Sequence, residues 1–183
     1  MKALETIYIS PVNFKDNELF ESLSHELSRR FGFPCAIFPL AKDLSFAFNP
    51  DRGQYHSTKI FRLLGAEIPE DGLRILIVVH VDLYVPELRF VFGEAEIGGP
   101  AAIISLARLW PEFYRLKPDR TLFKARTVKE AVHELGHTFG LAHCGNPSCV
   151  MFFSNSLLDT DRKKSDFCPA CRKELLKLLD KQF

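Results

Sequence analysis

Apolar residues recur along the chain in two patterns, one typical of helices and one typical of buried strands. Between residues 16 and 31 the apolar positions are three or four apart, as in an amphipathic helix, and Gly32 follows as a stop signal. These positions are Leu19, Phe20, Leu23, Leu27 and Phe31. The segment 73–81 is instead nearly continuously apolar, which predicts a strand in the middle of a sheet.

The same criteria predict the remaining elements. Further strands are expected at 6–9, 33–40, 89–97 and 101–109, and further helices at 55–64, 127–139 and 169–180. Thr127, with Glu130 three residues later, fits a capping box at the start of one helix. This order of elements predicts an α/β (α+β) fold with a mixed five-stranded sheet. We expect one domain, 1–183, with an N-terminal lobe, 1–141, and a small, irregular C-terminal lobe, 142–183, that ends in a helix.

Length and charge narrow the class of protein. The 183 residues suit one domain or two small lobes that share a cleft. With 24 basic and 23 acidic residues the net charge is +1, which gives no support for nucleic-acid or membrane-surface binding. The longest apolar run, 73–79, is too short to span a membrane, and residues 1–10 do not resemble a secretory signal. We therefore expect a cytoplasmic protein, and a monomer.

The segment 133–143 carries three histidines and a glutamate at spacings that suit a catalytic metal. His133 and His137 are four residues apart, so on a helix both imidazoles lie on one face and can bind one Zn²⁺ ion. Glu134 follows the first histidine and can reach a water at that metal. Gly140 can take a left-handed turn that returns His143 as a third ligand. Three protein ligands leave one position open, which is typical of catalytic zinc.

Four of the five cysteines form two pairs in the last forty residues. Cys144 and Cys149 precede Cys168 and Cys171 by a gap of eighteen residues, which is near the usual spacing of four-cysteine zinc sites. A closed set of four thiolates would be structural, so we expect two zinc ions per chain. Two disulfides are the alternative. Zinc in this small lobe would contribute directly to its folding energy.

Together these residues resemble the metzincins and, within them, the archaemetzincin family. The likeness rests on the motif HExxHxxGxxHCx4CxM followed by CxxC, at residues 133–171. It implies a zincin fold with the active-site helix in the N-terminal lobe, and a Met-turn at Met151 beneath the imidazoles. It also implies that a peptide binds as an extended strand along 89–97, with 152–167 lining the pocket beyond the scissile bond. Where some metzincins have a tyrosine two residues after the methionine, this chain has Phe153, so the oxyanion donor is unassigned.

The expected activity is zinc-dependent peptide hydrolysis with Glu134 as the general base. The main alternative is a zinc-binding protein of the same fold that binds peptides with little or no turnover. A third is an adaptor built on the cysteine site, which would need a basic surface. We expect the charged residues of 159–166 to face solvent. His25, His56 and His80 have no metal-ligating partner at a suitable spacing and are expected to be structural or surface residues.

Overall fold

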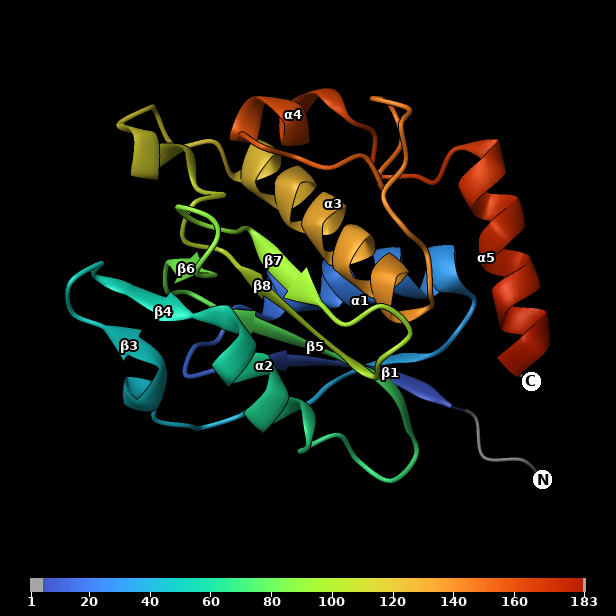
Figure 1. Ribbon diagram of the computed structural model, residues 1–183, viewed down its shortest axis with the longest axis horizontal. Helices are drawn as coiled ribbons and strands as arrows, with labels where there is room; N and C mark the ends of the chain where they lie inside the picture. Colours follow the sequence, from blue (N-terminus) through green and yellow to red (C-terminus); the bar gives the residue numbers. More distant parts are fainter. Residues whose placement is uncertain (1–4, 183) are drawn as a thin grey trace.

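The computed structural model describes residues 5–182, which form a mixed five-stranded sheet with helices on both faces (Figure 1). The strands are ordered β2 (Cys35–Ile37), β1 (Thr6–Pro11), β5 (Gly72–Val79), β8 (Ala101–Ser105) and β7 (Gly93–Ala95). Neighbouring strands are parallel, except that β7 is antiparallel to β8 and forms one edge. The expected α/β fold with a mixed five-stranded sheet is therefore confirmed.

Alternate residues of β5 enter two hydrophobic cores, one on each face of the sheet. Leu76 packs in the core that contains residues of α1 (Asn17–Phe31) and α3 (Arg120–Thr138). Ile77 packs in the core that contains residues of α2 (Ser57–Gly65). In Figure 1, α1 and α3 cover one face of the sheet and α2 covers the other. Burial on both faces explains why the sequence of β5 is apolar almost throughout.

Helix α3 begins seven residues earlier than its sequence pattern predicts. Its N-cap is Asp119, whose carboxylate accepts a hydrogen bond of 2.8 Å from the Leu122 amide. The expected cap at Thr127 is wrong, because this residue is buried inside the helix and its hydroxyl donates to the Phe123 carbonyl. The first two turns contain few apolar positions, so helical periodicity alone did not reveal them.

A second, three-stranded sheet was not predicted. It consists of β3 (Phe48–Asn49), β4 (Gln54–His56) and β6 (Leu83–Tyr84). Because β4 occupies the first residues of the expected helix 55–64, α2 starts only at Ser57. Strands of two or three residues are too short to show a period of two in the sequence.

The C-terminal part contains two helices, α4 (Leu157–Arg162) and α5 (Pro169–Gln182). The first was not predicted; a capping box between Ser156 and Asp159 starts it. Two short 3-10 helices complete the fold, η1 (Ser45–Ala47) and η2 (Pro111–Tyr114). The division into lobes at residue 141 stays a prediction. Within residues 5–182, none of the helices combines the length and apolar character needed to cross a bilayer.

Candidate active site

Three imidazoles converge at the C-terminal end of α3. His133 and His137 lie one turn apart on the buried face of the helix, at 4% and 6% exposure. Gly140 then adopts a left-handed φ of 103°, which reverses the chain and brings His143 back. The Nε2 atom of His137 lies 3.2 Å from that of His133 and 3.2 Å from that of His143. The turn predicted at Gly140 is confirmed by this geometry.

The two helical imidazoles are oriented by backbone carbonyls. Nδ1 of His133 donates to the Val150 carbonyl at 2.8 Å, and Nδ1 of His137 donates to the Leu141 carbonyl at 2.7 Å. Both Nε2 atoms therefore carry lone pairs, which point at a common centre. Tetrahedral zinc with Zn–N bonds of about 2.0–2.1 Å separates its ligand nitrogens by about 3.3 Å. The observed spacing fits such an ion.

The surroundings keep these imidazoles neutral. Burial lowers the pKa of His133 well below its ordinary value, and the nearby ammonium of Lys163 adds to this effect. Burial also lowers the pKa of His137 to about 4 and that of His143 in the same direction. Neutral imidazole is the form that binds metal, so the site is ready for a cation at neutral pH.

Glu134 lies beside the imidazoles, against the edge strand β7. Its carboxyl group is buried, and this burial raises its pKa well above the ordinary value, with a further contribution from the negative charge of Glu130. Gly93 of β7 allows the approach: a Cβ atom there would lie 2.6 Å from Glu134 Cγ and 2.7 Å from its Oε1. A carboxyl group with a raised pKa next to a possible metal is suited to accepting and returning a proton.

Met151 lies beneath the site, against the backbone of α3. A Cβ atom on Gly136 would come within 2.5 Å of the Met151 sulfur, so this contact depends on glycine. The Met151 carbonyl accepts a hydrogen bond of 2.9 Å from the Cys144 amide, next to His143. Met151 is fully buried, as expected for a residue of the apolar floor.

The four cysteines of the two predicted pairs form a second cluster. Their sulfur atoms lie within 4.8 Å of one another, and Cys144 Sγ is 3.9 Å from Cys168 Sγ. Tetrahedral zinc with Zn–S bonds of about 2.3 Å would separate its sulfur ligands by about 3.8 Å. The Cys168 amide also donates to Cys149 Sγ at 3.3 Å. All four thiols are free, so the disulfide alternative is not what the structure contains.

The thiols differ in acidity. A hydrogen bond from the Cys171 backbone lowers the pKa of Cys168 to about 7, while burial raises the pKa values of Cys149 and Cys171. Burial therefore favours the protonated thiol at Cys149 and Cys171 until a metal displaces the proton.

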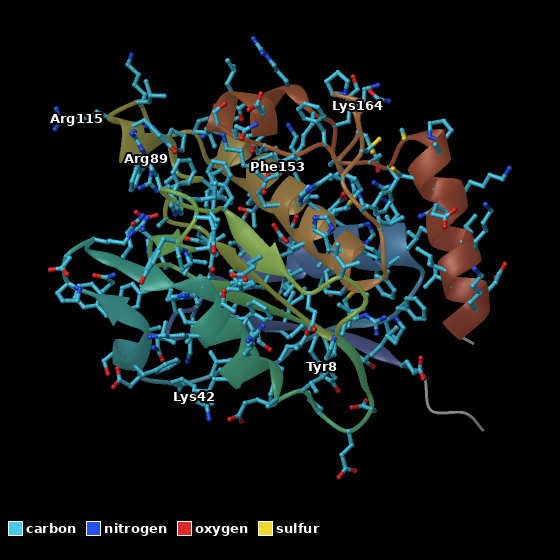
Figure 2. All side chains as sticks on the ribbon, in the orientation of Figure 1. Tyr8, Lys42, Arg89, Arg115, Phe153 and Lys164 are labelled. Atoms are coloured by element: carbon cyan, nitrogen blue, oxygen red, sulfur yellow. The ribbon has the colours of Figure 1, made fainter. Side chains whose placement is uncertain are left out.

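An open groove of about 540 Å³ runs past the imidazoles, bordered by β7 on one side and by Phe153 on the other. A narrower pocket of about 250 Å³ opens beside Glu134, between the segment 88–93 and the wall 153–155. Phe153, labelled in Figure 2, lies over α3 between α4 and β7. Its ring centroid is 4.9 Å from that of His143.

Sequence reasoning did not single out four residues of this groove and pocket. His56, which was expected to be a structural or surface residue, lines the groove, as do Gly93 and Glu94 of the expected substrate-binding segment 89–97. Glu94 accepts hydrogen bonds from the hydroxyls of Ser57 and Thr58, which joins β7 to the start of α2. Glu130 lies on the wall of the narrow pocket. A glycine within a predicted strand, as at Gly93, is the one signal that could have indicated a close backbone approach.

Comparison with known proteins agrees with this geometry. Residues 41–177 match the family model described as Peptidase family M54. The archaemetzincin of Methanocaldococcus jannaschii is 44% identical over 175 residues, which cover 96% of this chain and 95% of that protein. The crystal structure of the Methanopyrus kandleri archaemetzincin superposes with a TM-score of 0.86 at 34% identity, over 98% of this chain and 97% of that one. A zinc-dependent peptidase from Methanocorpusculum labreanum gives 0.84 at 34% identity, over 92% of this chain and 99% of that one.

Proposed function

Since this chain belongs to peptidase family M54, the archaemetzincin family of zinc metallopeptidases, we propose that it hydrolyses peptide bonds at the three-histidine site, with Glu134 as the general base. The observation that carries this proposal is the convergence of three imidazoles beside a buried carboxyl group, with the His137 Nε2 atom 3.2 Å from each of the other two Nε2 atoms. His133, His137 and His143 would hold the catalytic zinc.

The chain's own groups have separate tasks in this reaction. Zinc would supply Lewis-acid activation of a water molecule and of the substrate carbonyl. The Glu134 carboxylate accepts the proton of the attacking water and then donates it to the leaving amine. Burial raises its pKa from the ordinary carboxyl range toward the operating pH, where one group can both accept and return a proton in a cycle. The carbonyls of Val150 and Leu141 keep the imidazoles of His133 and His137 in the required tautomer.

The free edge of β7 is suited to an extended peptide. The backbone groups of an antiparallel strand point alternately to its two sides. The Val91 amide donates to the Leu83 carbonyl on the side away from β8, whereas the Phe92 carbonyl accepts from the Ser105 amide on the side of β8. By alternation, the backbone groups of Gly93 and Ala95 point away from β8. A substrate strand antiparallel to β7 would pair with them. Its C-terminal side would then lie along 88–92, next to the narrow pocket.

We further propose that the four cysteines hold a second, structural zinc. Four thiolates leave no open position for substrate. Cys144 is adjacent to His143, and Cys149 adjoins Val150, whose carbonyl orients His133. The cluster would therefore hold two parts of the catalytic site in place as well as stabilise the C-terminal residues.

A second candidate function is peptide binding with negligible turnover, and Phe153 is the observation that favours it. Its ring is close to His143 but has no hydroxyl group to donate to a developing oxyanion. The intact Glu134 favours hydrolysis.

A chelator experiment tests the proposal. Purified protein is incubated with a peptide library before and after zinc removal, and again after zinc is restored. Cleavage should disappear with the metal and return with it. Cleavage that persists after both sites have lost zinc would overturn the proposal, whereas retained peptide binding without cleavage in any sample would favour the second candidate.

A further inference from the structure

We propose that the buried ion pair Glu130–Lys163 is the specificity-determining floor of the narrow pocket beside Glu134. By fixing the wall 153–155, it would make the pocket select an apolar side chain on the leaving-amine side of the scissile bond. The proposal rests on the substrate direction inferred above.

The pair is buried. The side chains of Lys163 and Glu130 are 0% and 3% exposed, and Lys163 Nζ lies 3.2 Å from Glu130 Oε1. The expectation that Lys163 faces solvent is therefore wrong. Glu130 Oε1 also accepts a hydrogen bond of 3.1 Å from the Thr160 hydroxyl, and Lys163 Nζ donates to the Phe152 carbonyl at 3.5 Å.

These contacts hold the segment 152–163, which contains the pocket wall, at its two ends. Phe152 immediately precedes the wall residues 153–155, whereas Thr160 lies within α4 and Lys163 immediately follows it. One carboxylate on α3 and one ammonium thus join the two ends of the segment to each other and to the active-site helix. Glu130 is one helical turn before Glu134, so the wall is set relative to the general base.

Stability alone is a weak reason for such a pair. Burying two charges costs desolvation energy that their attraction often only offsets. Replacing such a pair with apolar residues of similar size therefore frequently leaves the stability of a protein unchanged or higher. Glu130 reaches the pocket surface, where an unpaired carboxylate would repel an apolar group. Paired with Lys163, it presents a neutralised floor beneath the apolar residues Phe90, Val91, Phe92 and Phe153.

The size of the pocket agrees with an apolar side chain. Its volume is about 250 Å³, and an engineered cavity of about 150 Å³ is enough to hold benzene. A leucine or phenylalanine side chain would fill it against the wall. If the wall 153–155 moved away, the outer carbons of such a side chain would lose their contacts with it.

The test measures binding, so it does not depend on turnover. Two peptide hydroxamates carry an isobutyl or a methyl group at the position that enters the pocket, and calorimetry gives their Kd values on zinc-loaded protein. The parent should favour the isobutyl compound by about 50-fold, from about fourfold per buried methylene. Lys163→Met should lower this ratio by about tenfold or more, because the wall no longer closes around the added carbons.

Two further variants separate positioning from folding. Glu130→Gln combined with Lys163→Met removes both buried charges, so stability should recover while the selectivity ratio stays low. Asp161→Asn is the matched control, because Asp161 ties the same α4 to the same α3 through Arg126 at 2.7 Å without lining the pocket. It should keep the parent ratio. If Lys163→Met fails to fold, the ratio of the two Kd values in the double variant tests the proposal.

Three results would overturn the proposal: a parent ratio near one, a ratio that recovers together with stability in the double variant, or an equal loss in Asp161→Asn. Failure of the parent to cleave any peptide, with the ratios as expected, would remove the proposed hydrolysis and leave this inference standing.

Discussion

Gly93 of β7 and Glu134 of α3 are packed so closely that a methyl group on residue 93 would lie 2.6 Å from the glutamate Cγ. The same methyl group would lie 2.7 Å from the Ile103 carbonyl of the neighbouring strand. Neither the strand nor the carboxyl group has space to accommodate it. The edge on which substrate is proposed to bind and the proposed general base are therefore positioned by one glycine.

Gly93→Ala should lower kcat by about 100-fold, since displacing a catalytic group by about 1 Å costs roughly that much. Zinc content should stay unchanged, because the carbonyls that orient the imidazoles belong to Val150 and Leu141, outside β7. Gly145→Ala is the control, as a Cβ there meets no atom within 4 Å. Steady-state kinetics and metal analysis check this; a Gly93→Ala enzyme as active as the control would contradict it.

Gly136→Ala should destabilise the protein although alanine favours helices. In an ordinary helix interior this change stabilises by about 0.5–1 kcal/mol. Here the added carbon would meet the Met151 sulfur at 2.5 Å, and overpacking of a tight core costs about 1–3 kcal/mol. We expect a lower thermal midpoint in calorimetry. A raised midpoint would mean that Met151 moves aside freely.

The two metal sites should respond differently to acid. Thiols bind zinc as thiolates, and burial raises the pKa values of Cys149 and Cys171, so affinity at the cysteine site should fall by at least about 100-fold per pH unit. At the histidine site the pKa of His137 is depressed to about 4, so protons begin to compete only as pH approaches that value.

Chelator competition between pH 7.5 and 5.5 measures both slopes. His137→Gln should retain zinc only at the cysteine site, so this variant gives the steeper of the two slopes separately. Equal slopes at the two sites would show that the thiols are already ionised before zinc binds.

Cys168→Ser should weaken zinc binding at the histidine site, although Cys168 is not one of its predicted ligands. The reason is the short covalent connection from Cys144 to His143, together with the hydrogen bond between the Cys144 amide and the Met151 carbonyl. Metal analysis by mass spectrometry after dialysis against a weak chelator gives the occupancy. Two sites that lose zinc independently would contradict the coupling.

The candidate site could be predicted from sequence where its geometry is local. His133 and His137 are one helical turn apart, and Gly140 needs only its own left-handed conformation to return His143. The cysteine cluster was predictable because two cysteine pairs at this spacing are typical of four-cysteine metal sites. The strand β5 was equally clear, because burial on both faces leaves an apolar run.

The residues that sequence did not reveal depend on contacts between distant segments. A glycine in a strand indicates a close approach, but the pattern around Gly93 does not identify Glu134 as its neighbour. Lys163 lies in a charged run that resembles a solvated surface, and only the fold brings it to Glu130. The start of α3 was missed for a different reason, since its cap at Asp119 precedes turns with little apolar periodicity.

The most direct test of the account compares the parent protein with Glu134→Gln, using zinc content and peptide-library cleavage on the same preparations. The account predicts two zinc ions in both proteins and a rate at least about 10²-fold lower in the variant, because only the proton transfer is removed. Equal cleavage rates would contradict the assignment of Glu134 as the general base.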